Sequence, residues 1–564
     1  MKKTLVYLKP YSATAIQGLM VKFVGSIAEL FLPLLLEYII DDIVPAGDLN
    51  MVLWMGLAML VCSLVAMFGN ILANRLSVKA AANMTHDLRY DLFAKTSYLK
   101  SGQVDEITVP SLVSRLTSDS YYVNQMVARS LRLGIRAPIL LIGGIILTFI
   151  IDWKLALVLL ACVPFVIVAI VIITRQSIPC YFNLQKSGDD MVRAMQENIS
   201  GVRVVKALSK EEYETRKFHE VSDRLARTEL RANKIMSLTN PLATLILNLG
   251  LVAVIVVGAL MSSGAGVVLA FLSYFTIILN AMLGLSKIFV VLSRGIASAD
   301  RIEKVLEMDE KQSVEEMPED DGGYMVRFRD VSFSYNGKED NLTGINFAVG
   351  KGKTLGIIGA TGSGKTTVIN LMMRFYDVRS GAVYIDGRDV RSLPPENLRA
   401  KFGVAFQNDF LMAASVKENI DYGRNLADCD IQKAIECAQA QFVYGLDGGL
   451  EYNLAQKAAN LSGGQKQRLT VARALAGNPQ ILVLDDSSSA LDYETDAAMR
   501  KAIATQYPDT TKIIIAQRVS SVMNADDILV LDDGRQIGYG THAELMNSCE
   551  EYRLIYRSQM GEDV

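Results

Sequence analysis

Histidine and cysteine are scarce in this sequence, which holds 3 histidines and 6 cysteines among 564 residues. The cysteines form no CxxC pair, and no histidine lies at metal-ligand spacing from them. A structural metal site needs such a cluster, so the sequence predicts none. The scattered cysteines are expected to serve as small apolar residues in a reducing compartment; they are Cys62, Cys162, Cys180, Cys429, Cys437 and Cys549.

An excess of basic residues is also missing, because the formal net charge is -3. Nucleic-acid-binding proteins present a clustered basic surface, so we do not expect a nucleic-acid partner. A removable signal peptide is not expected either. The start, MKKTLVYLKPYS, is basic, but the apolar stretch behind it is too long for a signal peptide and lacks a small-residue cleavage pattern.

Apolar residues, in contrast, are abundant: 51% of the chain is hydrophobic and 21% is charged. This balance predicts two environments, a lipid bilayer and water. Up to about residue 300, apolar runs approach the roughly 20 residues that cross a bilayer. We predict an all-α transmembrane domain over residues 1–307 with six spans, at about 13–43, 51–74, 133–151, 153–174, 241–261 and 265–291.

Basic residues predict the orientation of these spans. They are concentrated after the second and fourth spans, whereas the opposite connections are short and hold only Lys154 as a cation. The positive sides face the cytosol, so both termini are predicted to be cytosolic. The two cytosolic connections have a helical pattern, and we expect the membrane helices to continue through them. Their tips, GQVDEITVP and KALSKEEYE, are expected to meet the domain that follows.

A second domain is predicted beyond an acidic, polar linker at residues 308–323. From residue 324 to 564, β-rich and helical runs alternate, which indicates an α/β domain. LGIIGATGSGKTTVINLMM holds the complete G-x-x-x-x-G-K-[ST] pattern between a strand and a helix. Glycines let backbone N–H groups surround phosphates, Lys365 neutralises phosphate oxygens, and the Thr366 hydroxyl can bind Mg²⁺.

A second buried strand, ILVLD, ends in Asp485, whose carboxylate is expected to hold the same Mg²⁺. Between the two lies LSGGQKQRLTVARAL, where Ser462 and two glycines begin an amphipathic helix. This is a second candidate anion-binding helix N-terminus. One domain does not need two such sites for one nucleotide, so the second is predicted to serve a nucleotide held by another subunit.

With these motifs in this order behind six spans, nearly the whole chain resembles an ABC exporter half-transporter. The resemblance implies two halves that enclose two ATP molecules, each between the Walker A motif of one half and the signature of the other. It implies ATP contacts for Tyr335, for Gln407 of the glutamine loop and for the Walker A residues, and it makes Thr366, Gln407 and Asp485 the Mg²⁺ ligands. The implied motif residues are Gly359, Ala360, Thr361, Gly362, Ser363, Gly364, Lys365, Thr366 and Thr367 of Walker A; Leu461, Ser462, Gly463, Gly464 and Gln465 of the signature; and Ser489, Ala490, Leu491 and Asp492 of the D-loop.

Two residues depart from the hydrolysing members of this family. Asp486 stands where a catalytic glutamate is usual, and Gln517 stands where a switch histidine is usual. The shorter carboxylate lies about 1 Å from the position that aligns water, and a displacement of that size can cost about 100-fold in rate. An amide does not exchange a proton near neutral pH. His542 lies too far along the chain to replace the histidine.

These departures lead to the hypothesis that the chain is the degenerate half of a heterodimeric exporter in a bacterial cytoplasmic membrane. Its intact signature would complete the site of a partner that carries the glutamate and the histidine. Two alternatives remain: a homodimeric exporter with slow hydrolysis, and an ATP-gated channel or regulatory subunit. The stretch before the signature, YNLAQKAAN, also departs from the Gly- and Glu-containing family pattern, which leaves its contact with the cytosolic loops open.

The transported substrate is not identified by the sequence, and small molecules, lipids and peptides all remain candidates. Glu29 lies near the middle of the first span, where an ionisable group is costly and often marks a transport pathway. We predict a polar, cation-attracting spot there. The alternative is a structural hydrogen bond for Glu29, with Lys22 extending to the cytosolic interface. Asn248 and Asn280 are weaker candidates for the same pathway.

Overall fold

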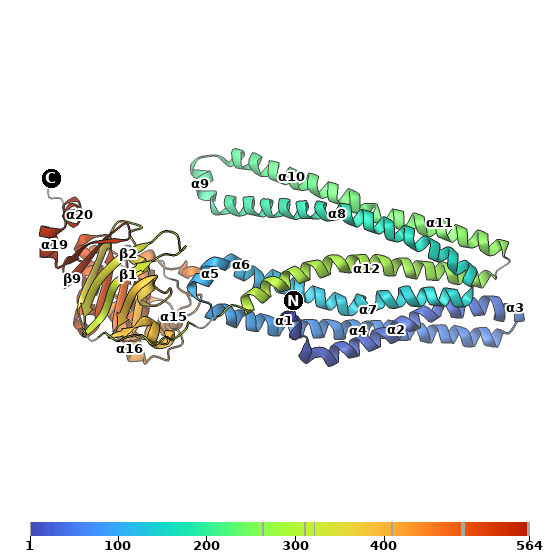
Figure 1. The fold of residues 1–564 in the computed structure, drawn as a ribbon, viewed down its shortest axis with the longest axis horizontal. Helices are drawn as coiled ribbons and strands as arrows, with labels where there is room; N and C mark the ends of the chain where they lie inside the picture. Colours follow the sequence, from blue (N-terminus) through green and yellow to red (C-terminus); the bar gives the residue numbers. More distant parts are fainter. Residues whose placement is uncertain are drawn as a thin grey trace. The chain divides into compact units, whose positions relative to one another are not determined.

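A computed structural model describes residues 2–261, 264–309, 312–320, 322–407, 410–486 and 491–560. These residues form two compact units (Figure 1). The first comprises Met1–Ser97 and Pro110–Met308, and the second comprises Tyr98–Val109 and Asp309–Val564. The short segment Tyr98–Val109 therefore belongs to the second unit, although both of its neighbours along the chain belong to the first.

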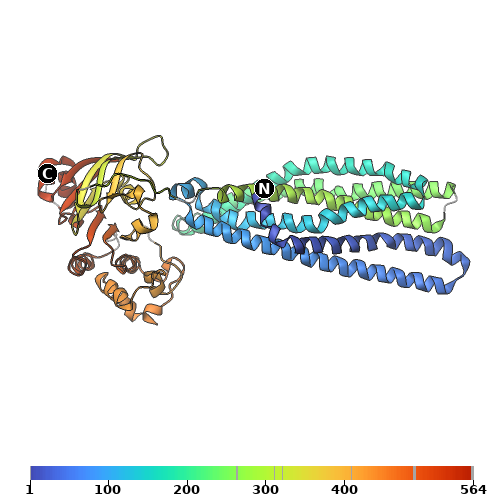
Figure 2. The same ribbon diagram turned by 60° about the horizontal axis from the view of Figure 1, so that its bottom comes forward.

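The first unit is helical, and its long helices run side by side along its length (Figures 1 and 2). The described helices of this unit are α1 Lys2–Val6, α2 Ser12–Tyr38, α3 Val44–Ala46, α4 Leu49–Tyr98, α6 Val109–Ser114, α7 Ser120–Ile151, α8 Trp153–Ser200, α9 Val202–Ala207, α10 Glu211–Ser237, α11 Thr239–Leu260 and α12 Ala265–Leu306, with π-helical turns at Ile39–Ile43 and Arg115–Asp119. α7 packs along α12 and α2, while α8 packs against α10 and α11.

Each of the six predicted spans overlaps one helix of this unit, and the first span also runs through the π-helical turn Ile39–Ile43; these helices are α2, α4, α7, α8, α11 and α12. Among the residues that the structure describes, four helical segments are long and apolar enough to cross a membrane: Lys3–Ala46, Leu49–Tyr98, Val109–Ile151 and Ala265–Leu285. Two shorter apolar segments, Trp153–Ala169 and Thr244–Leu260, coincide with the predicted fourth and fifth spans. α4 and α8, of 50 and 48 residues, continue well beyond their apolar parts, as the uninterrupted helical pattern predicts.

Two carboxylates, the partly buried Asp41 and the buried Asp119, join segments of the first unit that are distant in sequence. The Asp41 carboxylate accepts hydrogen bonds from the backbone N–H groups of Gly266 and Val267, at 2.7 and 2.8 Å, and so satisfies donors in the first turn of α12. Near the other end of α12, the Arg301 guanidinium donates to both oxygens of Asp119, at 2.5 and 2.9 Å. α12 is thus linked at its N-terminal end to the turn that follows α2, and near its C-terminal end to the turn that precedes α7.

The second unit contains a ten-stranded sheet in the order β5-β4-β1-β2-β10-β9-β3-β8-β7-β6. Its strands are β1 Tyr324–Phe333, β2 Leu342–Gly350, β3 Thr354–Gly359, β4 Ser380–Ile385, β5 Arg388–Asp389, β6 Phe402–Ala405, β7 Ile481–Asp485, β8 Thr511–Ala516, β9 Asp527–Asp532 and β10 Arg535–Gly540. Strands β9, β3, β8, β7 and β6 pair in parallel, whereas β1 pairs in antiparallel fashion with β2 and β4. The predicted α/β domain is confirmed.

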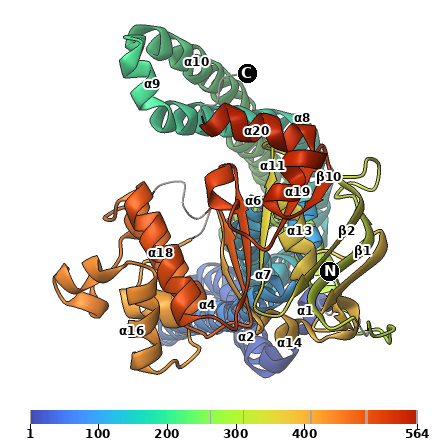
Figure 3. The ribbon, with the colours of Figure 1, turned by 90° about the vertical axis from the view of Figure 1, so that its left-hand side faces the viewer.

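The helices of this unit are α5 Ser101–Ile107, α13 Lys365–Met372, α14 Pro395–Arg399, α15 Val416–Asp421, α16 Asp428–Cys437, α17 Gly463–Leu475, α18 Tyr493–Gln506, α19 His542–Ser548 and α20 Glu550–Met560. Figure 3 shows α16 and α18 on one side of the strands, apart from α19 and α20. β7 is buried along its whole length, because β6 and β8 flank it and the α17 helix packs beside it. A continuous apolar strand, ILVLD, is the pattern expected for such a position.

Residues 312–320 of the predicted linker have neither helix nor strand and belong to the second unit. Arg374, which has 0% exposure, donates to the Ser313 carbonyl at 2.8 Å, and the Gln312 amide donates to the Arg374 carbonyl at 2.9 Å. The Glu315 N–H also donates to the Arg391 carbonyl at 3.0 Å. This polar segment is therefore held along the domain surface by backbone carbonyls and one buried guanidinium.

Candidate functional site

The candidate nucleotide site lies at one edge of the parallel strands. β3, β6, β7 and β8 all run in the same direction, so the residues that follow them meet at the same edge. Segments more than 100 residues apart in the chain therefore line one cavity of about 300 Å³. Its lining residues are Tyr335, Asn341, Thr361, Gly362, Gly364, Lys365, Thr366, Thr367, Gln407, Asp485, Asp486, Ile515, Ala516 and Gln517.

The phosphate loop follows β3 and leads into α13. Gly362 and Gly364 have φ values of +88° and +96°, a left-handed backbone that favours glycine. A Cβ atom on Gly364 would lie 2.5 Å from a Leu342 methyl carbon, so this position also lacks room for a side chain. The backbone conformation therefore favours glycine at both positions, and the lack of space also requires it at Gly364.

Lys365 lies in this loop with its amine turned toward the backbone. Its Nζ donates to the carbonyls of Gly359 and Ala360, at 2.9 and 2.7 Å, and burial lowers the pKa of the amine. Phosphate oxygens carry more negative charge than carbonyl oxygens and would be the stronger acceptors. The amine is thus positioned to bind the phosphates of a nucleotide.

Thr366 and Asp485 come together from α13 and β7. The Thr366 hydroxyl donates to Oδ2 of Asp485 at 3.2 Å, and burial raises the pKa of the Asp485 carboxyl group. A hydroxyl and a carboxylate side by side are oxygen ligands of the kind that Mg²⁺ prefers. The pair fits the metal that accompanies a bound nucleotide.

Asp486 occupies the centre of the polar contacts at this edge. Its φ is +48°, and its N–H donates to the Ile515 carbonyl at 2.9 Å, which anchors it beside β8. Oδ2 of Asp486 accepts hydrogen bonds from the amides of Gln407 and Gln517, at 3.3 and 3.4 Å. The Gln467 amide contacts the Asp486 carbonyl at 3.4 Å. Both residues that depart from the family pattern are therefore in direct contact with each other.

Tyr335 lies at the mouth of the cavity and is 47% exposed. Its ring packs edge-to-face against Phe333 and Tyr376, with centroid distances of 4.7 and 5.0 Å, and its hydroxyl donates to Thr367 at 3.3 Å. These contacts orient a partly exposed ring at the cavity, as stacking on a base requires. The sequence indicated Tyr335 but not Tyr376, which no motif contains.

Tyr376 also joins this aromatic cluster to the segment Tyr98–Val109. Its hydroxyl donates to the Asp105 carboxylate on α5, and burial together with that bond raises its pKa. Gln103 on the same helix donates to the Asp309 carbonyl at 3.1 Å. The first predicted cytosolic tip, GQVDEITVP, thus contacts the α/β unit, whereas the second, KALSKEEYE, belongs to the first unit.

The signature residues lie elsewhere on the same unit, since none of them lines the cavity. Ser462 caps α17: its hydroxyl accepts from the Gln465 N–H at 3.3 Å, and the Gln465 side chain accepts from the Ser462 N–H at 2.9 Å. Leu461 is buried beneath them and anchors the turn. This separation agrees with the expectation that Leu461, Ser462, Gly463, Gly464 and Gln465 face a different nucleotide.

Of the D-loop, Ser489 and Ala490 lie outside the described residues. Asp492 caps α18, where its Oδ1 accepts from the Thr495 N–H at 2.8 Å. His542 is remote from the site, and its ring contacts the Tyr552 hydroxyl at 2.8 Å, so it does not replace the missing histidine. Among the described residues, no three His, Cys, Asp or Glu side chains cluster as a metal site.

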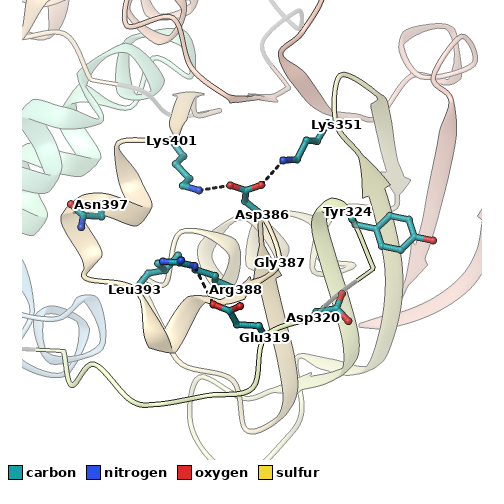
Figure 4. Close-up of a pocket in the computed structure, with 11 residues that line it drawn as sticks. Glu319, Asp320, Tyr324, Lys351, Asp386, Gly387, Arg388, Leu393, Asn397 and Lys401 are labelled. Atoms are coloured by element: carbon teal, nitrogen blue, oxygen red, sulfur yellow. Dashed lines mark hydrogen bonds and ion pairs between the residues drawn. The ribbon is translucent and has the colours of Figure 1, made fainter.

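A larger cavity, of about 660 Å³, lies away from the phosphate loop (Figure 4). Asp386 extends between Lys351 and Lys401, at 2.7 and 3.0 Å, and Arg388 pairs with Glu319 at 3.4 Å. These charged groups satisfy one another. Size alone therefore does not identify the nucleotide site, whereas the converging glycines, lysine and carboxylates do.

In the first unit, the predicted polar spot at Glu29 contains a partner that sequence reasoning missed. The Arg136 guanidinium donates to both Glu29 oxygens, at 2.7 and 2.9 Å. The structural alternative comprised an interhelical hydrogen bond for Glu29, which the bond from Arg136 provides, and an extension of Lys22 to the interface, which its 4% exposure contradicts. Asn248 and Asn280 are exposed and lie apart from this pair in the sequence. Arg136 lies inside the predicted third span, and its charge in an apolar segment was the available signal.

Comparisons with known proteins agree with this architecture. Residues 16–282 match the family model of the ABC transporter transmembrane region, and residues 342–489 match that of the ABC transporter. A solved structure of a bacterial Atm1-family ABC exporter with ATP bound superposes with a TM-score of 0.82 at 23% identity, and covers 99% of both chains. That likeness confirms the fold.

Sequence relatives span the whole chain. The Bacillus subtilis (strain 168) protein YfiB, described as an ABC transporter ATP-binding protein, is 34% identical over 100% of this chain and 99% of its own length. An ATP-dependent lipid A-core flippase of Vibrio parahaemolyticus is 28% identical over 100% of this chain and 98% of its own. The chain therefore belongs to the ABC transporter family, as an ATP-driven exporter half with a helical transmembrane domain followed by its ATPase domain.

Proposed function

We propose that this chain is the degenerate half of a heterodimeric exporter, and that its own nucleotide site mainly retains ATP. The observation that carries the proposal is the contact between Asp486 and Gln517 at the end of β7 and β8. The partner would supply a glutamate and a histidine at the corresponding positions of its own site. A homodimer with slow hydrolysis is the alternative within transport.

Binding of ATP is supported by residues that are complete in this chain. Lys365 would exchange its two carbonyl acceptors for phosphate oxygens, and Tyr335 would stack on the adenine. Thr366 and Asp485 would hold Mg²⁺, with Gln407 nearby, and the metal would neutralise phosphate charge. None of these roles needs Asp486 or Gln517, so binding and hydrolysis separate in this site.

Hydrolysis requires a group that orients water and accepts its proton. The Asp486 carboxylate is one methylene short, and its Oδ2 already accepts from the amides of Gln407 and Gln517. The amide of Gln517 can hold a phosphate oxygen but does not release or take up a proton. Misplacement by about 1 Å costs roughly 100-fold, and loss of proton transfer roughly another 100-fold or more.

The signature is proposed to serve the partner. Ser462 and the glycines that follow begin α17 with free backbone donors and the positive end of the helix dipole. A nucleotide bound to the partner's Walker A would be enclosed against this turn. The complex would then have one fast site and one slow site, in a bacterial cytoplasmic membrane with both termini in the cytosol.

Steady-state phosphate release tests the proposal. The full-length chain is purified alone and with a co-expressed partner, both in lipid nanodiscs. We expect ATP binding in both preparations but rapid hydrolysis only in the complex, because only the partner's site has a complete catalytic pair. Replacing the partner's Walker B glutamate by glutamine is the matched control and is expected to abolish turnover. Exporter-like hydrolysis by the isolated chain would refute the heterodimer.

A further inference from the structure

A polar cluster, in which Lys22 is buried and the other residues are partly buried, lies among α2, α4 and α7 in the transmembrane domain. Each helix contributes two residues on one face: Lys22 and Glu29 are seven apart on α2, Asn70 and Asn74 are four apart on α4, and Arg132 and Arg136 are four apart on α7. Arg132 and Arg136 lie at the predicted cytosolic end of the third span. We call these six residues the basic cluster.

Lys22 is the most enclosed member of the basic cluster. It is 4% exposed, and its Nζ donates to the side-chain oxygens of Asn70 and Asn74, at 2.7 and 3.3 Å. Both acceptors are neutral amides. In the part of the chain that the structure describes, no carboxylate lies within ion-pair distance of Lys22, so its charge is solvated by dipoles but is not neutralised.

The two arginines add further positive charge. Arg136 uses one nitrogen, Nη2, for both oxygens of Glu29, while its buried Nε has no hydrogen-bond partner. Arg132 donates from Nε only to the Ala128 carbonyl in its own helix, at 3.2 Å. Both arginines and Glu29 lie within electrostatic range of Lys22.

Three cations and one carboxylate leave the basic cluster with an excess of positive charge. This reverses the sign of the cation-attracting spot that Glu29 alone predicts. Unneutralised charge is costly within a membrane, and an anion with several oxygen acceptors would relieve it. The unused Nε of Arg136 and the remaining donors of Arg132 are suited to phosphate oxygens.

We propose that the basic cluster binds the phosphate-bearing headgroup of an amphipathic substrate, with its apolar chains in the bilayer. The proposal adds a substrate class to the proposed export function. It rests on that proposed function for the direction of transport. Glu29 competes with the headgroup for Arg136. A substrate anion that displaced Glu29 would change the link between α2 and α7, the first and third long helices.

Native mass spectrometry of the full-length chain with its partner tests the binding step without nucleotide. The probes are phosphatidylglycerol and diacylglycerol, which lacks a phosphate, with identical acyl chains, and inorganic phosphate serves as competitor. We expect preferential binding of phosphatidylglycerol. Lys22→Gln and Arg132→Gln should each weaken it roughly tenfold, whereas Glu29→Gln should strengthen it, because the substitution releases Arg136. Lys154→Gln, an exposed cation outside the cluster, is the matched control and should have no effect.

Opposite shifts in lipid affinity for Lys22→Gln and Glu29→Gln would indicate a binding site. If the charges were only structural, both variants would lose stability and the lipid preference would not change. Arg132→Gln, at a less buried position, preserves the test if Lys22→Gln impairs folding. If millimolar inorganic phosphate displaced the lipid, the ligand of the basic cluster would be a free phosphate ion rather than a lipid headgroup. Equal retention of the two lipids by the unsubstituted complex would overturn the proposal. ATP hydrolysis is not measured here, so this failure is distinct from failure of the heterodimer.

Discussion

Restoring glutamate and histidine at the ends of β7 and β8 should convert the proposed slow site into a fast one. In the structure, the amides of Gln407 and Gln517 lie 3.3 and 3.4 Å from Oδ2 of Asp486. Glutamate would extend the carboxylate by one carbon–carbon bond, about 1.5 Å, beyond these amides. By aligning the attacking water, such an extension recovers up to about 100-fold in the hydrolysis rate, but only if the residue at position 517 also supports the reaction.

We therefore expect Asp486→Glu alone to raise hydrolysis only a few-fold, and Gln517→His alone to leave it nearly unchanged. The double substitution should raise it by roughly 100-fold or more, since the two groups act on one water and are not additive. Phosphate release is measured in a complex whose partner carries an inactive Walker B, so that only this chain's site can turn over.

Two controls complete this experiment. Lys365→Ala in the double variant should remove the gain, because the phosphates lose their buried cation. Asp509→Glu lengthens an exposed aspartate outside the cavity in the same way and should change nothing. Full recovery by Asp486→Glu alone would remove Gln517 from the reasoning, and an unsubstituted site that already turns over rapidly would refute all of it.

Three further predictions concern the stability of the ATPase domain in the full-length chain. Ala458 is buried and has a φ of +49°, so Ala458→Gly should raise the free energy of unfolding by about 1 kcal/mol. Ala459→Gly, at a helical φ of -60°, should lower that free energy. Chemical denaturation measures both variants, and a destabilising Ala458→Gly would contradict backbone strain at this position. Arg374→Met should destabilise the ATPase domain by roughly 3 kcal/mol or more in thermal unfolding, because the carbonyls of Ser313 and Arg391 lose a buried donor. The control Arg379→Met, at the surface, should cost less than about 1 kcal/mol. Lys351 and Lys401 hold the pKa of Asp386 below its ordinary value of 3.8, so their contribution is fully present above that pH and declines as the pH falls below it. Asp386→Asn should cost about 1 kcal/mol at pH 7 and progressively less below pH 3.8, and a cost that does not decline in acid would exclude the ion pairs as its cause.

Sequence motifs predicted the candidate nucleotide site because its chemistry is local. The phosphate loop, the end of ILVLD and the signature each need particular residues in adjacent positions, so glycines, Lys365 and Asp485 could be named without a structure. The predicted ABC fold and the family are confirmed. The heterodimer and the degenerate character of Asp486 and Gln517 stay predictions.

Residues that act through contacts distant in sequence were beyond such patterns. Tyr376 lies in no motif, yet it joins Tyr335 to Asp105, residues separated by 230 positions in the chain. The polar linker gave no sign that the buried Arg374 would hold it. In both cases the contact depends on which surfaces the folded chain brings together.

The sequence by itself determined the division into a membrane part and an ATPase part, since hydrophobic length and glycine-loop chemistry are properties of contiguous residues. Only the tertiary structure decided what the membrane charges form. Glu29 alone predicts a negative spot, but the packing of α2 against α4 and α7 places it with Lys22, Arg132 and Arg136. The field at a point is the sum over all nearby charges, and that sum depends on three-dimensional position.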